Sequence, residues 1–371
     1  MDANRLDTLL AVANRFQLDD SIAAIEELGN GNVNDTYRVL LAGEGGKSFV
    51  LQRLNKRVFP EPRQVMHNIL LYSEHVNEKL RRGCSSLVGR RWEVPKVLVG
   101  RQSGEPWVEE NGNFWRGISY IAGCRSVDTI TDQRQAREVG VGLGLFHTLV
   151  QDLPAHALAD TLPGFHITPD YLKQFELVVD NAGTRPGADL EHAIAFVRKR
   201  QAWVTVLEDA KASGALPIRP IHGDPKINNL MMEEGSGQAI ALIDLDTVKP
   251  GLIQYDIGDC LRSGCNSLGE DTSAWPLVRF DLSQCEAILR GYGSIARSFL
   301  TAADYHYLFD AIRLITFELG LRFLTDYLGG DMYFKTTYPK QNLARSMVQF
   351  RLTESIEEQE SGLRSLIDSL R

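Results

Sequence analysis

Hydrophobic positions divide the chain into a first third with a strand-like pattern and a remainder with a helix-like pattern. In the first third, short apolar runs bounded by Gly and Asn indicate strands at 22–28, 36–41, 48–54, 96–100 and 115–121, with a hairpin turn at 43–46. Helical spacing occurs there within about the first 20 residues and again at 61–82. The sequence therefore predicts a β-rich domain at 1–122.

The second part of the chain, 123–371, is dominated by amphipathic helices. We expect helices at 133–151 and 189–213 and from about 281 onward, and a charged amphipathic helix at 354–371 that closes the domain. A strand–loop–strand unit at 220–246 interrupts them, and a hinge is expected at 121–125. The predicted fold class is therefore α+β, with two domains.

Composition narrows the function classes. Forty Lys and Arg residues against 48 Asp and Glu residues give a net charge of −8, which argues against a nucleic-acid or anionic-membrane partner bound by bulk electrostatics. The chain shows neither an apolar run of about 18 residues nor a signal-peptide pattern, so we expect a cytoplasmic protein. Its five cysteines lack Cys-x-x-Cys spacing and are expected to be reduced and mostly buried. The oligomeric state stays open.

The main candidate chemistry lies in the loop of the unit at 220–246. Residues 221–230 read Ile-His-Gly-Asp-Pro-Lys-Ile-Asn-Asn-Leu, and Asp244 follows Asn229 by 15 positions. A short polar loop between two apolar strands brings several side chains to one end of a buried hairpin. Asp224 can accept a proton or orient a hydroxyl group, whereas Asn229 and Asp244 offer hard oxygen ligands that suit magnesium.

This order of residues resembles the catalytic loop and metal-binding Asp of protein-kinase-like phosphotransferases. The His-Gly-Asp opening and the Ile-Asp ending are similar to the aminoglycoside/choline kinase branch. The resemblance implies a two-lobed kinase-like fold, with a β-rich N-lobe, a mainly helical C-lobe, and ATP with Mg²⁺ as cofactors. It also implies that Asp224 is the catalytic base, that Asn229 and Asp244 bind magnesium, and that Lys226 neighbours the transferring phosphoryl group.

Two residues are expected to support this loop. The segment Tyr-Asp-Ile-Gly-Asp at 255–259 is similar to a segment of that branch in which an Asp braces the catalytic loop, and Asp259 is our candidate. His222 is expected to be structural and to hydrogen-bond to the backbone or to Asp259, because Asp224 already supplies a base.

The N-terminal domain contains a candidate nucleotide-binding hairpin. Gly29, Asn30, Gly31 and Asn32 lie between two expected strands, where their backbone amides would cover ATP phosphates as a Gly-rich loop does. The third glycine of such a loop is missing.

The Lys that the family carries on its third strand is also missing from 48–54. Strand alternation places Gln52 at that position, while Arg53 has the suitable charge but needs a bulge to turn it toward phosphate. We choose Arg53 as the nucleotide ligand. Its acidic partner is expected from the helix at 61–82, as either Glu74 or Glu78.

Acceptor specificity is expected from the helix around 314–327. Glu318, Arg322 and Asp326 are spaced by four and share a helix face, and they lie with Tyr327 beside an aromatic cluster. Charged groups beside aromatic rings suit the hydroxyl groups and the apolar ring face of a sugar. An exposed ladder of ion pairs is the alternative.

Several stretches together are similar to N-acetylhexosamine 1-kinases within the branch: 34–37, 51–55, 162–166, 243–247 and 322–328. The resemblance implies a small-molecule sugar substrate, phosphorylated on the anomeric hydroxyl of GlcNAc or GalNAc. The alternatives are a kinase of an aminoglycoside, choline, homoserine or methylthioribose, and a catalytically silent nucleotide-binding protein. An aminoglycoside or choline pocket should carry carboxylates, whereas Arg322 favours a neutral or acetylated sugar.

Overall fold

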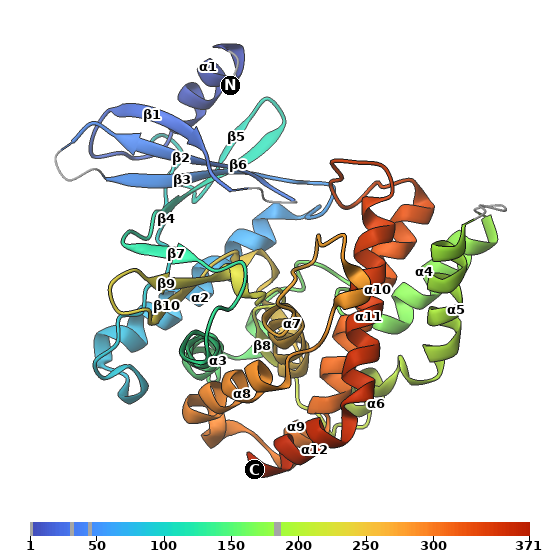
Figure 1. The fold of residues 1–371 in the computed structure, drawn as a ribbon. Coiled ribbons are helices and arrows are strands. Elements are labelled where there is room, and N and C mark those ends of the chain that lie inside the picture. The colour runs from blue at the N-terminus through green and yellow to red at the C-terminus, as the bar shows by residue number, and fades with distance from the viewer. Residues whose placement is uncertain (1–2, 30–32, 44–46, 182–186) are drawn as a thin grey trace.

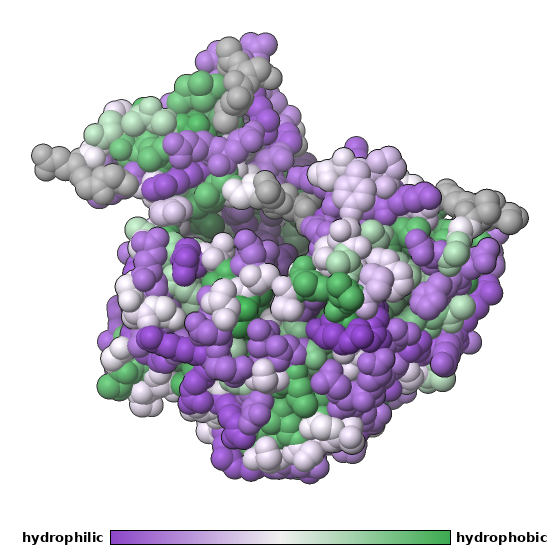
Figure 2. Space-filling view, in the orientation of Figure 1, coloured by the Kyte–Doolittle hydropathy of each residue, from purple (hydrophilic) through white to green (hydrophobic). Residues whose placement is uncertain are grey.

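The computed structural model describes residues 3–29, 33–43, 47–181 and 187–371, which form two lobes (Figure 1). The smaller N-lobe is built on an antiparallel sheet, and the larger C-lobe is mainly helical. This architecture confirms the predicted α+β fold class. Figure 2 shows a hollow between the two lobes. The proposed boundary at 122/123 follows the last strand of the N-lobe sheet.

In the described part of the chain, the N-lobe sheet has six strands in the order β1-β2-β3-β6-β4, and β5 also pairs with β6. The elements are α1 (Ala3–Ala13), β1 (Ile22–Glu27), β2 (Asp35–Leu41), β3 (Ser48–Leu54), α2 (Pro62–Arg82), β4 (Val97–Leu98), β5 (Val108–Glu110) and β6 (Asn113–Ser119). All the pairings are antiparallel. The expected strand at 96–100 is shorter than predicted, because β4 covers only Val97–Leu98. Most of the expected turn at 43–46 lies outside the described residues.

The C-lobe combines helices with short hairpins. Its elements are β7 (Cys124–Ser126), α3 (Gln133–Val150), α4 (Thr168–Asn181), α5 (Ala188–Arg200), α6 (Val206–Ala212), β8 (Arg219–Ile221), β9 (Leu230–Glu233), β10 (Ala239–Leu242), β11 (Lys249–Gly251), α7 (Ile253–Gly264), α8 (Leu282–Ala296), α9 (Ala302–His306), α10 (Leu308–Gly329), α11 (Gln341–Glu358) and α12 (Glu360–Ser369). Strands β10, β9 and β7 form one small sheet, and β11 pairs with β8. The predicted hinge at 121–125 therefore leads directly into a C-lobe strand.

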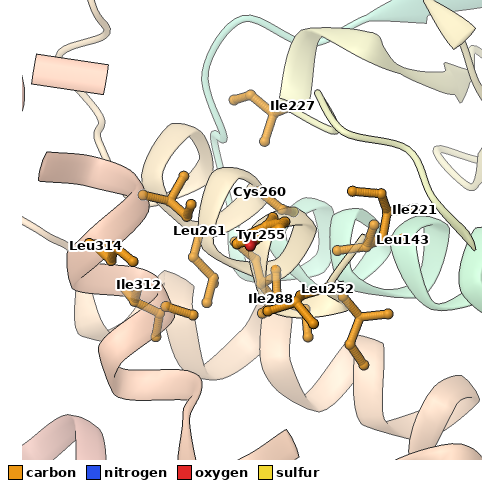
Figure 3. Close-up of a cluster of buried hydrophobic side chains, with 14 of the residues drawn as sticks. Leu143, Ile221, Ile227, Leu252, Tyr255, Cys260, Leu261, Ile288, Ile312 and Leu314 are labelled. Carbon is orange, nitrogen blue, oxygen red and sulfur yellow. The ribbon is translucent and has the colours of Figure 1, made fainter. Parts of the chain in front are cut away.

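The main hydrophobic core lies in the C-lobe and extends into α2. Figure 3 shows side chains from α3, α8, α10 and β8 gathered around α7. A separate, smaller core joins α1 to the buried face of the N-lobe sheet. Tyr72 of α2 stacks on Phe146 of α3, with the ring centroids 5.4 Å apart. Helix α2 therefore shares its main core with the C-lobe, although it follows N-lobe strands in the sequence.

Glycine allows α3 and α8 to approach closely. A Cβ atom on Gly140 would lie 1.8 Å from the carbonyl oxygen of Ile288, and one on Gly291 would lie 2.0 Å from that of Arg137. No side chain fits at either position. Glycine at these two positions therefore lets the backbones of α3 and α8 lie in direct contact.

Two helix predictions needed correction, and two helices were missed. The expected helix at 189–213 is two helices, α5 and α6, separated by a 3₁₀ turn at Gln201–Trp203. Trp203 packs edge-on against Phe317 there, and the following Val204-Thr205-Val206 run has low helix propensity. The expected final helix at 354–371 is the end of α11 followed by α12. Helices α4 and α7 were not predicted.

The chain contains free cysteines, as expected, of which Cys124, Cys260, Cys265 and Cys285 are buried and Cys84 is half-buried. Within the described ranges, no helix combines the length and apolar character needed to cross a membrane.

Candidate active site

The predicted catalytic loop connects β8 to β9 at the floor of the cleft. Gly223 has φ +85°, and a Cβ atom there would lie 2.6 Å from the carbonyl oxygen of Thr247. The loop therefore requires glycine immediately before Asp224. This turn places the loop against Thr247, the last residue of the η5 turn (Leu245–Thr247) that follows Asp244.

Asp224, Lys226 and Asn229 meet within this loop. Lys226 Nζ donates to Asp224 Oδ2 at 2.8 Å, and Asn229 Nδ2 donates to the Asp224 carbonyl oxygen at 2.7 Å. Burial raises the pKa of Asp224, but the Lys226 ammonium outweighs burial and the net pKa lies below the usual range. The pKa of Lys226 is raised, because the carboxylates of Asp224 and Asp244 outweigh its burial. The pair is thus an ionised carboxylate beside a cation.

Asp244 follows β10 in a left-handed conformation, with φ +64°. Surrounding protein and the nearby Asp246 carboxylate raise the pKa of Asp244 to about 6. The Asp244 side chain is exposed, so a ligand can reach it. Asn229 uses its amide nitrogen toward Asp224, so its amide oxygen is the atom left for a ligand. One carboxylate and one amide oxygen are hard donors, and this set fits magnesium.

The bracing contact comes from Asp256, not from Asp259 as we predicted. Asp256 accepts hydrogen bonds from the backbone amides of His222, at 2.7 Å, and Gly223, at 2.8 Å. Buried His147 contacts the same carboxylate at 2.9 Å. Asp259 lies three positions further along α7 and pairs instead with Arg262. The motif at 255–259 was therefore recognised correctly, but the wrong Asp was chosen.

His222 has the structural geometry that we expected. Its Nε2 donates to the Ile243 carbonyl oxygen at 2.9 Å, and its Nδ1 accepts from the Asp224 amide at 3.3 Å. Burial lowers the pKa of His222. A neutral ring with its proton on Nε2 satisfies both contacts.

Arg53 does not reach the cleft. The pairing of β3 with β2 and β6 is regular from Leu51 to Arg53, so the bulge that this prediction required is absent from the described strands. Arg53 shares the sheet face of Leu51, which packs against α1, and its own side chain is exposed there and donates from Nε to Asp35 at 2.8 Å. Gln52, on the other face, accepts from Arg116 Nε at 2.8 Å. We therefore withdraw Arg53 as the proposed nucleotide ligand.

Arg116 is a buried cation on the same face of the N-lobe sheet as Gln52, and sequence reasoning missed it. It stands opposite Gln52 on β6, is only 2% exposed, and forms an ion pair with Asp246, two residues after Asp244. Asn34 Nδ2 also donates to Asp246, at 2.6 Å. An Arg between apolar residues of a strand is unusual and marks a buried cation, but Arg116 lies on β6 and not on the third strand, where the family carries its Lys.

Two N-lobe predictions remain: the glycine-rich turn at 29–32 and the acidic partner on α2. Gly29 is described, with φ +69°, whereas Asn30, Gly31 and Asn32 lie outside the described residues. Of the two candidate acidic partners, Glu74 is exposed and Glu78 pairs with Arg81 and Arg82 of its own helix.

On the acceptor side, Arg322 lies in a cage of four aromatic rings. Its guanidinium carbon is 5.0 to 5.5 Å from the ring centroids of Phe165, Tyr171, Tyr333 and Phe334. Such contacts are cation–π interactions. Burial lowers the pKa of Arg322, but the surrounding phenols and the carboxylates of Glu318 and Asp224 raise it above its ordinary value. Arg322 therefore faces the same region as the candidate base.

The other predicted acceptor residues have different contacts. Glu318 is 1% exposed and binds His166 and Thr168, at 2.9 and 2.7 Å. Asp326 accepts from the backbone amides of 332–334 and so holds the loop after α10. Tyr327 is half-buried and packs against the main core. Of the four predicted acceptor residues, Arg322 is therefore the one suited to contact an acceptor.

Comparisons with known proteins agree with this geometry. The model of the phosphotransferase enzyme family matches residues 24–297. The structure of a microcompartment-associated aminopropanol kinase is 18% identical, with a TM-score of 0.65 over 96% of this chain and 98% of that one. An aminoglycoside phosphotransferase from Alicyclobacillus acidocaldarius is 14% identical, with a TM-score of 0.58 over 97% and 96%. Amicoumacin kinase hAmiN, solved with AMP-PNP, Ca²⁺ and Ami, is 14% identical, with a TM-score of 0.55 over 97% and 94%.

Proposed function

Because the chain belongs to the phosphotransferase enzyme family, we propose that it is an ATP-dependent small-molecule kinase that phosphorylates the anomeric hydroxyl of GlcNAc or GalNAc. The family assignment supports phosphoryl transfer to a hydroxyl group of a small molecule. The observation that carries the choice of acceptor is the Arg322 guanidinium inside its aromatic cage.

The catalytic loop supports a direct transfer. Asp224 takes the proton of the acceptor hydroxyl while the acceptor oxygen bonds to the γ-phosphorus. The bond from the γ-phosphorus to the β–γ bridging oxygen breaks, so the products are the sugar 1-phosphate and ADP. Lys226 keeps its proton and offsets negative charge beside Asp224. An anomeric hydroxyl is more acidic than an ordinary alcohol, so it makes a modest demand on this base.

Asn229 and Asp244 are the residues that would hold the divalent ion. When bound, magnesium neutralises charge on the β- and γ-phosphates. The neighbour amicoumacin kinase was solved with a nucleotide analogue and a divalent cation, which supports the same cofactor class here.

The cage argues against a cationic acceptor. Aromatic rings arranged around a point are the usual binding site for an ammonium group. Here the chain's own guanidinium fills that point, and within the described residues no hydrogen bond to the Arg322 side chain competes with a ligand. Its N–H groups suit sugar hydroxyls or an acetamido carbonyl oxygen.

An amine-bearing acceptor is the competing proposal. Two of the similar structures are named as an aminopropanol kinase and an aminoglycoside phosphotransferase. A site for such a substrate needs carboxylates near the cage, but Glu318 is occupied by His166 and Thr168, and Asp326 by backbone amides. We therefore place the amine acceptors second.

The test is an ADP-release screen over GlcNAc, GalNAc, glucose, galactose, choline, an aminopropanol and an aminoglycoside, with the phosphorylated position read by phosphorus NMR. We expect turnover with an N-acetylhexosamine and a product phosphorylated at the anomeric carbon. The matched control is the methyl glycoside of GlcNAc, which keeps every group except the anomeric hydroxyl and should be inert.

Phosphorylation of the methyl glycoside would overturn the position of transfer. Faster turnover of an amine than of any sugar would overturn the acceptor class while leaving the kinase proposal standing. ATP binding without turnover of any acceptor would favour a catalytically silent nucleotide-binding protein. The cytoplasmic location stays a prediction.

A further inference from the structure

His166 connects the acceptor helix α10 to the catalytic loop. Its Nδ1 lies 2.9 Å from Glu318 Oε1, and its Nε2 lies 2.7 Å from the Gly223 carbonyl oxygen. Both partners are acceptors only. A neutral imidazole carries one N–H, so both contacts are satisfied only by the doubly protonated ring. Thr168 Oγ1 donates to the second oxygen of Glu318 at 2.7 Å and fixes that carboxylate.

The backbone around His166 is strained, and the surroundings hold it in place. His166 is 4% exposed and has φ +66°, which is uncommon for a residue other than glycine. Its ring stacks on Tyr255 with centroids 5.2 Å apart. Strain of this kind persists where several contacts determine one conformation, and it concentrates at functional sites.

The charges around the ring favour its protonated form. Burial lowers the pKa of His166, but the Glu318 carboxylate and the Gly223 carbonyl outweigh burial, and the net pKa is raised above the ordinary value of a histidine. The other titratable groups that face it are Tyr255 and Asp259 of α7 and Tyr171 of α4, whose hydroxyl contacts the His166 backbone.

These contacts form a continuous path across the site. Glu318 lies one helical turn before Arg322 on α10, and Gly223 immediately precedes Asp224. The sequence analysis assigned Glu318 to the acceptor, but its buried carboxylate contacts His166 and Thr168.

We propose that His166, held as an imidazolium by Glu318, is a positioning residue that fixes the catalytic loop so that Asp224 faces the acceptor bound at Arg322. This inference rests on the proposed function for the role of Asp224. Loss of the ring proton leaves one nitrogen lone pair facing either Glu318 or the Gly223 carbonyl oxygen, and that repulsion loosens the loop.

The decisive variant is Glu318→Gln, which keeps the shape of the side chain and removes its charge. A glutamine amide can donate to Nδ1 of a neutral His166, whose Nε2 proton still reaches Gly223, while the amide oxygen accepts from Thr168. We expect kcat of the parent protein to fall at alkaline pH as His166 loses its proton, and kcat of Glu318→Gln to stay flat over the same range. An unchanged alkaline fall in the variant would overturn the inference.

The second variant is His166→Asn, because asparagine tolerates positive φ but is too short for both contacts. We expect kcat to fall by about tenfold or more with little change in the ATP KM, as for loss of a hydrogen bond that positions a catalytic group. Equal kcat in the parent and in His166→Asn would also overturn the proposal. If His166→Asn fails to fold, the isosteric Glu318→Gln still decides the question.

A readout without any acceptor separates this inference from the proposed function. Hydrogen–deuterium exchange of the peptide covering 219–231 should be about tenfold faster in His166→Asn than in the parent at pH 6. In the parent it should accelerate between pH 6 and pH 9, and in Glu318→Gln it should not accelerate beyond the intrinsic pH dependence. Inactivity toward every sugar together with this exchange pattern would overturn the proposed function alone. Exchange rates in both variants equal to those of the parent at every pH would overturn the inference alone.

Discussion

Replacement of Arg116 by glutamine tests how the N-lobe is attached to the metal loop. The Arg116 and Asp246 side chains are 2% and 3% exposed, and the paired atoms Nη1 and Oδ1 are fully buried. Removing one partner of a buried ion pair leaves an uncompensated charge and costs about 3–5 kcal/mol. Asn34 still donates to Asp246 in the variant, so we expect the lower end, about 3 kcal/mol.

The assay is urea unfolding. With an m-value of about 3 kcal/mol/M, the expected loss lowers the unfolding midpoint by about 1 M. The matched control is Arg53→Gln. Arg53 lies on β3 opposite Trp115, the residue before Arg116, and its ion pair with Asp35 is exposed. An exposed pair contributes about 0–1 kcal/mol, so the control midpoint should barely move.

A second measurement asks whether the contact serves nucleotide binding. Arg116→Gln should raise the ATP KM, since it removes one of the contacts that hold Asp246, two positions after Asp244, whereas Arg53→Gln should leave the ATP KM unchanged. Equal urea midpoints for the two variants would show that the buried pair adds nothing over a surface pair. A larger increase in the ATP KM for Arg53→Gln than for Arg116→Gln would restore Arg53 as the nucleotide ligand.

The remaining predictions concern the catalytic loop and the acceptor side. Asp224→Asn should keep the fold and ATP binding while kcat drops by about 100-fold or more, as for loss of a general base; a variant with most of its turnover would remove Asp224 from the mechanism. In Asp244→Ala, calorimetry should show ATP affinity that no longer depends on magnesium, and an undiminished magnesium effect would contradict the metal assignment. Arg322→Ala should lower kcat/KM for the sugar by a factor that corresponds to about 1.5–3 kcal/mol of transition-state stabilisation, with little effect on ATP binding alone. A lower melting temperature with unchanged sugar kinetics would make Arg322 purely structural.

The catalytic loop was predictable because its residues are local. Asp224, Lys226 and Asn229 lie within six positions, so their spacing alone predicted that they meet, and the structure places them in contact. Most strands of the N-lobe were predictable for the same reason, since a period of two along one segment reports on one sheet face, but the three-residue strand β5 is too short to show that period and was missed.

The supporting contacts were not predictable, because they depend on distant segments. His166 and Glu318 are 152 positions apart, and Asn34 and Asp246 are 212 apart. The choice between Asp256 and Asp259 depends on the rotational phase of α7, which a five-residue motif does not define. Arg53 was chosen for its charge, but regular strand pairing turned it away from the cleft.

Anchoring of α2 in the C-lobe limits how this kinase can be switched. Asn68 of α2 is fully buried and donates to the carbonyl oxygens of Ala159 and Val248, both in the C-lobe. In protein kinases, control is exerted by repositioning the helix that follows the third strand. Here that movement would break both hydrogen bonds and expose the packed face of the helix, so on–off control by helix displacement is closed to this enzyme. Any opening of the cleft would then have to move the sheet and α1 relative to a helix that stays with the C-lobe.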